Sequence, residues 1–416
     1  MHEKIITFAS PVFFILIALE FIVARKRQRH LYRINDSLNS LSLGVMSQII
    51  GAFSKLFSIG MYALVLKYLS LFNLPSDSVW VWVAALLLYD FLYYWLHRMG
   101  HQTNLLWAAH VVHHQSEQYN LSTALRQTST GPLFGWIFYL PMALIGFPLD
   151  VFIAVALIDL LYQFWVHTEQ IGKLGWFDRI FVSPSNHRVH HAVNDMYLDK
   201  NFGGILVIWD RLFGTFIEER DHVAIVYGTR KPLRSWNPLW ANLEVYEQVW
   251  RDAWHTKNWL DKLQIWLRPP NWRPADLLAQ SAPTTFNLQR PIYDPAMSKA
   301  TTWYCIVQFI LLLQAATHFL LVYKSISALN ATIYVSWLVM GLWCIGGLME
   351  RGRIYLLPET VRILCILVMN LFTANWFYSF ALSTPIQALL TATCLISLVG
   401  LWLIFSRQKT HGHLPH

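Results

Sequence analysis

The sequence is poor in cysteine and in charge, and both shortages limit what the protein can be. Its four cysteines, Cys305, Cys344, Cys365 and Cys394, lie in apolar stretches after residue 304 and show no CxxC spacing. Disulfides and thiolate-bound metals are therefore not expected, and a metal held earlier in the chain would need nitrogen or oxygen ligands. Charged residues make up only 13% of the chain, whereas soluble domains carry about 25%.

The sequence instead contains long apolar stretches, and hydrophobic residues account for 55% of it. Because about 20 apolar residues cross a bilayer as a helix, we expect an all-α, polytopic membrane helical bundle with a cytoplasmic, histidine-rich helical cap. The expected spans are residues 5–24, 45–70, 79–96, 303–324, 331–349, 360–381 and 385–405. A further pair lies within 132–166, which bends at Gly146-Phe147-Pro148 and is expected to form either two spans or a re-entrant hairpin.

The formal charge of +8 would suit a nucleic-acid partner, but the basic residues lie beside apolar runs, where they orient a membrane protein. We therefore expect no nucleic acid. A basic cluster directly follows the first apolar run, at residues 25–33. The positive-inside rule then predicts an outer N-terminus, and alternating spans put residues 97, 167–300 and the C-terminus in the cytoplasm. The membrane would be the bacterial inner membrane or the endoplasmic reticulum.

Four segments follow from this pattern. They are N-terminal transmembrane helices (1–78), a histidine-rich region (79–230), a cytoplasmic or interfacial helical segment (231–300) and C-terminal transmembrane helices (301–416). Residues 246–268 are expected to form one amphipathic helix, whose tryptophans Trp250, Trp254, Trp259 and Trp266 suit the headgroup zone. An ordinary helix of a soluble cap is the alternative.

Nine of the 17 histidines fall between residues 97 and 191. The candidate ligands are an HxxxH pair, two HxxHH triplets and a single residue: His97, His101, His110, His113, His114, His167, His187, His190 and His191. On a helix, residues three and four apart share one face, so each motif presents its imidazoles together. Imidazole suits iron, zinc or copper, and nine ligands exceed the four to six positions of one ion. The spacing therefore predicts two ions.

The chemistry around these histidines favours iron over zinc. Zinc hydrolases typically use three ligands and a general-base carboxylate, whereas no carboxylate lies within these clusters. The Glu-x-x-His pattern of soluble diiron bundles is also missing. A membrane metal-binding or transport protein is the alternative of another class, but it would need ligands along a path at the membrane midplane.

Stretches between the histidines resemble a known family. "YNLSTALRQ" (119–127), "FWVHTE" (164–169), "NHRVHH" (186–191) and "DKNFGGILVIWDRLFGTF" (199–216) are similar to the alkylglycerol monooxygenases, within the fatty acid hydroxylase/sterol desaturase superfamily of membrane diiron enzymes. The resemblance implies two iron ions, O2, ether-lipid cleavage and tetrahydrobiopterin as external reductant. It also implies that all the candidate histidines except His167 are the essential, catalytic ones. Gln102 and Phe202 depart from the family pattern, which has an acidic residue and a tyrosine there.

The resemblance leaves one alternative within enzymes, a fatty acyl or sterol hydroxylase or desaturase fed by a redox protein. The sequence has no haem, ferredoxin or flavin motif, so either enzyme needs an external electron donor. Asp90 lies two helical turns before His97 and is expected to be catalytic, since a charge inside a span is costly. Further supporting candidates are Glu117, Glu169, Asp195 and Asp199, whereas Arg126 and Arg188 are expected to meet a lipid phosphate or to anchor the membrane side.

Overall fold

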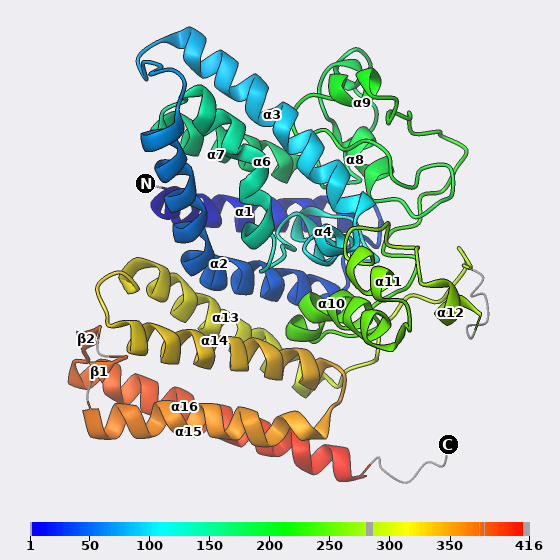
Figure 1. The fold of residues 1–416 in the computed structure, drawn as a ribbon. Helices are drawn as coiled ribbons and strands as arrows, with labels where there is room; N and C mark the ends of the chain where they lie inside the picture. Colours follow the sequence, from blue (N-terminus) through cyan, green and yellow to red (C-terminus); the bar gives the residue numbers. More distant parts are fainter. Residues whose placement is uncertain (1, 280–285, 374, 378, 411–416) are drawn as a thin grey trace. The chain divides into compact units, whose positions relative to one another are not determined.

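A computed structural model describes residues 2–279, 286–373, 375–377 and 379–410, and the side chains of these residues except 2–10, 405 and 407–410. The described chain is mostly helical and has two short strands, which confirms the expected fold class (Figure 1). It divides into two compact units. The first unit comprises Met1–Arg33, Gly51–Leu233 and Ala241–Ile292, and the second comprises Ile34–Ile50, Arg234–Trp240 and Tyr293–His416. The four-segment division stays a prediction.

The first unit contains most of the short helices. Its elements are α1 (His2–Lys26), α3 (Val79–Gln102), α4 (Asn104–Ala108), η1 (Val111–His114), α5 (Leu121–Ala124), α6 (Pro132–Ile145), α7 (Leu149–Trp165), η2 (Phe177–Arg179), α8 (Pro184–His190), α9 (Ile208–Leu212), α11 (Trp259–Gln264) and α12 (Ala275–Leu278). Two helices have residues in both units, α2 (Ile34–Leu69) and α10 (Pro238–His255).

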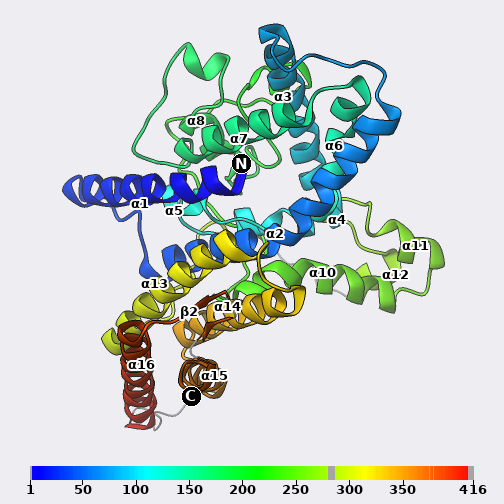
Figure 2. The same cartoon turned by 90° about the vertical axis from the view of Figure 1, so that its left-hand side faces the viewer.

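The second unit is built mainly from long helices (Figure 2). They are α13 (Lys299–Val322), α14 (Ala328–Met349), α15 (Leu356–Thr373) and α16 (Thr384–Thr410), with the 3-10 turn η3 (Arg353–Tyr355) before α15. Two short antiparallel strands, β1 (Asn375–Trp376) and β2 (Phe380–Ala381), connect α15 to α16.

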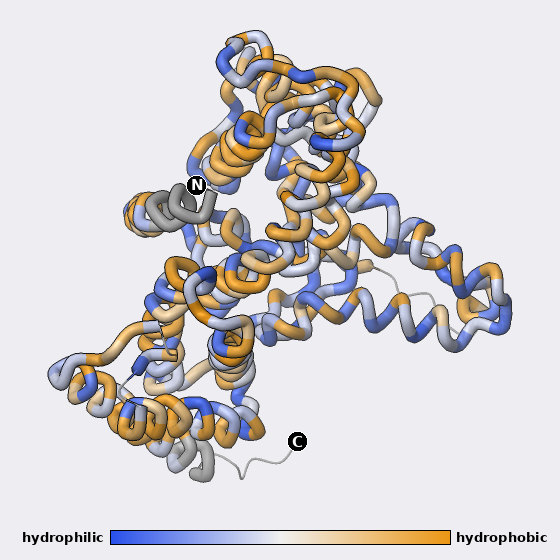
Figure 3. Tube along the Cα trace, turned by 60° about the vertical axis from the view of Figure 1, so that its left-hand side comes forward, coloured by the Kyte–Doolittle hydropathy of each residue, from blue (hydrophilic) through white to orange (hydrophobic). Residues whose placement is uncertain are grey.

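Among the described residues, six helical segments are long and apolar enough to cross a membrane, so the chain is an integral membrane protein. They are Ile34–Leu69, Val79–Gln102, Lys299–Val322, Ala328–Met349, Arg353–Thr373 and Thr384–Ile404. Figure 3, coloured by hydropathy, shows that the long helices consist mainly of hydrophobic residues. The expected span 5–24 falls in α1, and the side chains of its first residues lie outside the described part.

One predicted span is wrong at its end. Residues 360–381 do not form a single helix, because α15 stops at Thr373. The Asn375 amide donates to the Thr373 carbonyl (2.8 Å), and the Thr373 hydroxyl accepts from the Asn375 backbone N–H (3.3 Å). Such local side-chain bonds compete with helical ones, and they lead the chain into the β1–β2 hairpin.

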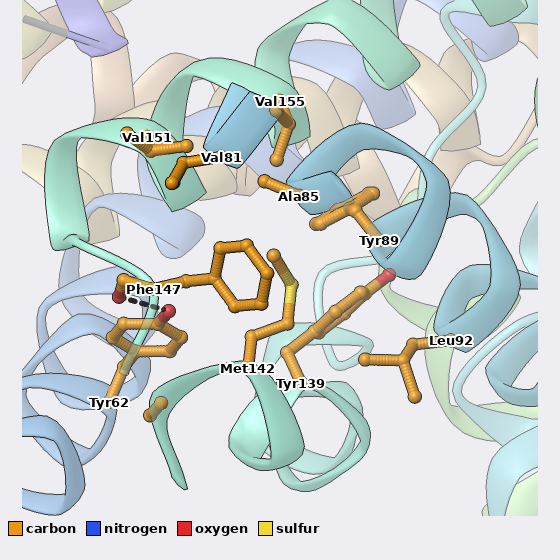
Figure 4. Packing of buried hydrophobic residues seen from close by; sticks show 11 residues of the cluster. Tyr62, Val81, Ala85, Tyr89, Leu92, Tyr139, Met142, Phe147, Val151 and Val155 are labelled. Atoms are coloured by element: carbon orange, nitrogen blue, oxygen red, sulfur yellow. Dashed lines mark hydrogen bonds between the residues drawn. The ribbon is translucent and has the colours of Figure 1, made fainter. Parts of the chain in front are cut away.

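The bent pair within 132–166 is present as α6 and α7, of 14 and 17 residues. Both are shorter than the roughly 20 residues that cross a bilayer, which favours a re-entrant hairpin. The bend needs glycine at Gly146, whose φ is +106° and whose Cβ would lie 1.9 Å from the Phe72 carbonyl oxygen. Figure 4 shows the core that this hairpin forms with α3, in which Tyr89 stacks on Tyr139 with ring centroids 4.5 Å apart. This core fixes α3, which carries His97 and His101.

The expected helix over 246–268 is two helices, α10 and α11. The helix breaks because the Thr256 hydroxyl donates to the Asp276 carboxylate (3.0 Å) and the Asn258 side chain caps α11 at the Leu260 N–H (2.9 Å). Trp250, Trp254 and Trp259 are among the most exposed large side chains of the first unit. Their place in the headgroup zone stays a prediction.

Candidate metal centre

The structure brings all nine candidate histidines into two groups. In each group, one ring nitrogen per residue lies within 4.8 Å of the corresponding nitrogen of every other member. The five-histidine group contains His97, His101, His110, His114 and His190, and the four-histidine group contains His113, His167, His187 and His191. His110 is partly exposed, and the other eight are buried. The two groups are neighbours, since the rings of His114 and His191 stack with centroids 4.4 Å apart.

Each HxxHH triplet is divided between the two groups, which the sequence did not predict. In the first triplet, His110 and His114 belong to the five-histidine group, and His113 belongs to the other. In the second triplet, carried by α8 and its C-cap, the i, i+4 pair belongs to the four-histidine group and the middle residue to the other. Residues four apart therefore stay on one side, and the residue between them faces the adjacent group.

The nitrogens that meet in each group are mostly Nε2 atoms. In the five-histidine group, His110 Nε2 lies 3.1 Å from His97 Nε2 and 3.0 Å from His114 Nε2, which is 3.2 Å from His190 Nε2. In the four-histidine group, the Nε2 atoms of His113, His167, His187 and His191 form a similar series with steps of 3.1, 3.0 and 3.2 Å. Such close nitrogens repel one another unless a proton or a cation lies between them.

One four-residue segment, Asp199–Phe202, orients three of the five histidines through their Nδ1 atoms. Nδ1 of His97 lies 2.8 Å from the Phe202 carbonyl oxygen, Nδ1 of His190 lies 3.0 Å from the Lys200 carbonyl oxygen, and Nδ1 of His101 lies 3.2 Å from an Asp199 carboxylate oxygen. Because carbonyl oxygens only accept hydrogen bonds, the protons of His97 and His190 are on Nδ1 and their Nε2 lone pairs face the group. Asp199, one of the supporting acids predicted from the sequence, therefore contacts a histidine of this group.

This segment has an unusual backbone that buried polar contacts hold in place. Asp199 and Asn201 have φ of 55° and 56°, a left-handed conformation that Asp and Asn adopt more readily than most residues. The Asn201 amide donates to the carbonyl oxygens of Asn186 (3.0 Å) and Ile217 (2.9 Å). The carboxylate of Asp210, fully buried, accepts from the backbone N–H groups of Phe202 (2.7 Å) and Gly203 (2.8 Å). Asp210 was not predicted as a site residue from its sequence position.

The four-histidine group is oriented by other parts of the chain. Nδ1 of His113 contacts the Arg126 carbonyl oxygen (2.9 Å), and Nδ1 of His167 contacts the Gln163 carbonyl oxygen (2.8 Å). The ring of Tyr119 stacks on His167 with a centroid distance of 5.5 Å, and its hydroxyl donates to the Val166 carbonyl (2.9 Å). His167, single in the sequence, is thus as firmly placed as the histidines of the motifs.

Two arginines proposed to meet lipid phosphate are instead buried within the first unit. The Arg188 guanidinium forms a bidentate pair with Glu219 (3.0 and 2.7 Å) and donates to the carbonyl oxygens of Thr168 (2.9 Å) and Ile171 (2.7 Å). Arg126 is 1% exposed and donates from Nε to the Val112 carbonyl (2.8 Å). Their role is therefore neither phosphate binding nor membrane-side anchoring. Both arginines instead fix the backbone beside the four-histidine group.

Asp90 is buried, but none of its described hydrogen bonds goes to a histidine. Its carboxylate accepts from the backbone N–H groups of Ile205 (2.7 Å) and Leu206 (3.0 Å) and from the indole of Trp209 (2.8 Å). Asp90 therefore positions the loop that follows Phe202, and its expected catalytic role stays a prediction. The loop approaches closely because Gly204 has no side chain: a Cβ there would lie 2.5 Å from Asp159 and 2.9 Å from Asp90.

Two further buried acids were missed by the sequence analysis. Asp159 on α7 accepts from Gln163 (2.6 Å), whose backbone carbonyl orients His167. Glu20 on α1 accepts hydrogen bonds from the hydroxyls of Tyr32 and Thr168 and from the Leu121 N–H (2.8 Å). An acid inside an apolar run was the available signal for both.

Burial keeps seven of the imidazoles neutral. Burial is the main cause that lowers the pKa of His110, His114, His167, His187, His190 and His191 well below the usual value, and neighbouring imidazoles lower it further. For His113, burial lowers the pKa to about 4. Neutral imidazole is the metal-binding form, so these side chains are ready to bind a cation near pH 7.

The donor set fits metal ions better than it fits a network of hydrogen bonds. His101 Nε2 is buried without a hydrogen-bond partner, although its Nδ1 contacts Asp199. A buried unpaired nitrogen is costly, and a cation bound by the group would satisfy it. The fold and the site together define a membrane protein with two adjacent histidine groups able to bind metal.

Comparison with known proteins agrees with this class. A model of the "Fatty acid hydroxylase" family matches residues 82–215, the range that holds all nine histidines. The chain is 36% identical to alkylglycerol monooxygenase of Danio rerio over 413 residues, covering 98% of this chain and 90% of that protein. It is 36% identical to alkylglycerol monooxygenase of Homo sapiens over 368 residues, covering 88% and 82%. Ornithine lipid hydroxylase OlsE of Rhizobium tropici is 32% identical over 135 residues, covering 32% and 41%.

No solved structure matches the chain. The long alignments nevertheless decide its relationship: the chain belongs to the alkylglycerol monooxygenase family, within the fatty acid hydroxylases. The resemblance inferred from the histidine motifs is thereby confirmed. The chain is an enzyme of the oxidoreductase class, since these relatives are oxygenases and hydroxylases.

Proposed function

We propose that this protein is a membrane diiron monooxygenase that uses O2 to hydroxylate the carbon next to the ether oxygen of an alkylglycerol lipid. The observation that carries the proposal is the pair of neighbouring nitrogen-only groups, with five and four histidines. Alignment over 90% of the Danio rerio alkylglycerol monooxygenase supports the ether-lipid substrate.

One iron would be held by each histidine group. An ion of about six-coordination keeps one free position beside five imidazoles and two beside four, which leaves room for O2 or water. When bound, the irons would supply the oxidising power to break an unactivated C–H bond. Asp199, and the carbonyl groups of Lys200, Phe202, Arg126 and Gln163, would fix the imidazoles by holding their Nδ1 protons.

The chain's own residues also exclude water from the site. The buried ring of Phe202 lies 5.2 Å from the His101 ring and 5.8 Å from the His190 ring, centroid to centroid. The Trp107 ring lies 5.1 Å from His101. An aromatic wall of this kind keeps solvent from consuming the oxidant.

Electrons would come from an external donor, either tetrahydrobiopterin or a redox protein. The site lies at the C-terminal end of α3, a membrane-spanning helix that carries His97 and His101. A lipid could therefore reach it laterally with its ether bond near the headgroup level. We propose that this end of α3 is cytoplasmic, because the basic cluster at residues 25–33 predicts an outer N-terminus.

Product analysis with purified protein tests the proposal. Iron-loaded protein in lipid nanodiscs, supplied with an alkylglycerol, O2 and reduced pterin, should release fatty aldehyde and glycerol. His190→Ala should abolish the product, and His255→Ala should not, because His255 is exposed on α10, where its Nδ1 lies 2.7 Å from the Arg251 carbonyl oxygen. Product from a fatty acid or sterol but none from the ether lipid would assign the other substrate class. No oxygen uptake with any of these lipids and either donor would refute the oxygenase.

A further inference from the structure

The second unit contains a cavity of about 350 Å³ among its membrane-spanning helices. No histidine of the two metal-binding groups lines it. Its walls come from α13, α15 and α16, from Trp337 on α14, and from Trp376 and Phe380 of the β1–β2 hairpin. The lining positions run from Gln308 to His318 on α13, which corresponds to about 15 Å along a helix axis. The cavity is therefore long, and its volume is at the lower end of the range of ligand pockets, roughly 300–1,000 Å³.

A buried polar network lines one part of this cavity. The Arg362 guanidinium donates to both carboxylate oxygens of Glu359, from Nε (2.8 Å) and Nη2 (2.7 Å). Nη2 also donates to Gln308 Oε1 (2.7 Å), and the Gln308 amide donates to the Ser397 hydroxyl (2.7 Å). Arg362 lines the cavity and is 3% exposed, and none of these hydrogen bonds uses its third nitrogen, Nη1. Nη1 can therefore donate to a ligand in the cavity.

The charges in this network restrict the ligand. Glu359 is fully buried and balances the charge of Arg362, so the pair is neutral as a whole. A ligand with a net charge would leave that charge unpaired among membrane helices, at a large desolvation cost. A neutral group that accepts a hydrogen bond would satisfy Nη1 without this cost.

The rest of the wall is mainly apolar, with Gln314, His318 and Thr393 as further polar residues, and it reaches the outside of the unit. Ile366 and Leu390 line the cavity, as do Ile386 and Leu389, whose side chains are 46% and 69% exposed. On a membrane-spanning helix such exposed leucine and isoleucine face lipid chains. A ligand could thus enter from the bilayer beside α16 with its chain along these residues.

We propose that this cavity binds one uncharged, single-chain lipid. A hydroxyl or carbonyl oxygen of its head accepts a hydrogen bond from Arg362, and its alkyl chain lies along α13 and α16. The site takes part in no chemistry itself, and the proposal does not depend on the proposed function.

Photo-crosslinking tests it in the full-length protein. The probe is a monoacylglycerol with a diazirine in its acyl chain, added to protein in phosphatidylcholine nanodiscs. We expect labelling at Leu390 and Thr393, which line the cavity, and competition by unlabelled monoacylglycerol but much less by an ionised fatty acid. Filling the cavity with Ala315→Phe should lower the labelling about tenfold or more, the loss expected for roughly 1.4 kcal/mol of binding energy.

Leu395→Phe is the matched control, because Leu395 is on α16, is 51% exposed and does not line the cavity. It should keep wild-type labelling. Elution as a single species and an unchanged iron content would show that both variants fold. His190→Ala should lose enzyme activity and keep the labelling, which separates this site from the proposed reaction. Three results would overturn the proposal. Ala315→Phe could be labelled as strongly as the wild type, or the label could spread over Leu395 and its lipid-facing neighbours. An ionised fatty acid could also compete as well as unlabelled monoacylglycerol.

Discussion

His97 at the end of α3 is oriented by Phe202, 105 residues later in the chain: its Nδ1 lies 2.8 Å from the Phe202 carbonyl oxygen. The same short segment, Asp199–Phe202, contacts two further histidines of the five-histidine group. The geometry of that group therefore depends on a loop that supplies no ligand, and on the acids that hold the loop.

Asp210→Asn should weaken metal binding although Asp210 touches no histidine. Its two carboxylate oxygens each accept one backbone N–H, from Phe202 and Gly203, and an asparagine would turn its NH2 group toward one of them. Losing a contact of this kind typically lowers metal affinity 10–100-fold. Iron retained during dialysis against a chelator measures this. Asp221→Asn, which changes an exposed side chain paired with Lys173, is the control. If both variants lost the same amount of iron, the loop held by Asp210 would have no effect on metal binding.

Gly204→Ala should impair folding of the site. The added Cβ would lie 2.5 Å from Asp159, 2.8 Å from Tyr93 and 2.9 Å from Asp90, all buried or partly buried and fixed by hydrogen bonds. We expect overpacking to cost about 1–3 kcal/mol, seen as a lower unfolding temperature together with reduced iron content. Gly172→Ala is the matched control, since a Cβ there meets nothing within 4 Å. An unchanged Gly204→Ala protein would contradict the described packing.

Arg188→Lys should destabilise the protein more than the same change at an exposed ion pair. Lysine cannot keep the bidentate pair with Glu219 and the bonds to the carbonyl oxygens of Thr168 and Ile171. Breaking a buried pair costs about 3–5 kcal/mol. Arg230→Lys changes the exposed pair with Asp195 and should cost about 0–1 kcal/mol. Thermal unfolding of the two variants in one detergent gives the comparison, and similar unfolding temperatures would argue against a structural role for Arg188.

Metal removal should make the protein sensitive to mild acid. Burial lowers the pKa of the imidazoles in the folded, metal-free protein, to about 4 for His113, whereas an unfolded histidine titrates near 6.5. The unfolded state thus binds more protons, and the free energy of unfolding falls as the pH drops from about 6.5 toward 4. Each such histidine contributes about 1.4 kcal/mol per pH unit in this window. Unfolding temperatures of the chelator-treated protein at several pH values test this; a flat profile would mean that the groups are hydrated.

The sequence alone was enough to predict which histidines meet in the two groups, but not how they are arranged. HxxxH and HxxHH spacing identified eight of the nine histidines as sets, because helix periodicity brings residues three and four apart together. The division of each triplet between two groups depends on where α8 and η1 lie in the fold, which local spacing does not encode.

The supporting residues were harder to predict, because their partners are far away in sequence. Asp90 was correctly singled out as a buried charge inside a span, but the loop at Ile205 that it holds lies 115 residues later. Asp210 and Arg188 look like ordinary charged residues of a polar segment. Only their burial and hydrogen bonds identify them as structural.

Iron content of matched variants tests the central claim most directly, that the two histidine groups each hold one iron. After anaerobic loading and removal of excess metal, we predict about two irons per wild-type and His255→Ala chain. We predict about one for His190→Ala, from the five-histidine group, and about one for His187→Ala, from the four-histidine group. One iron or none in the wild type, or two in either of the last two variants, would contradict the account.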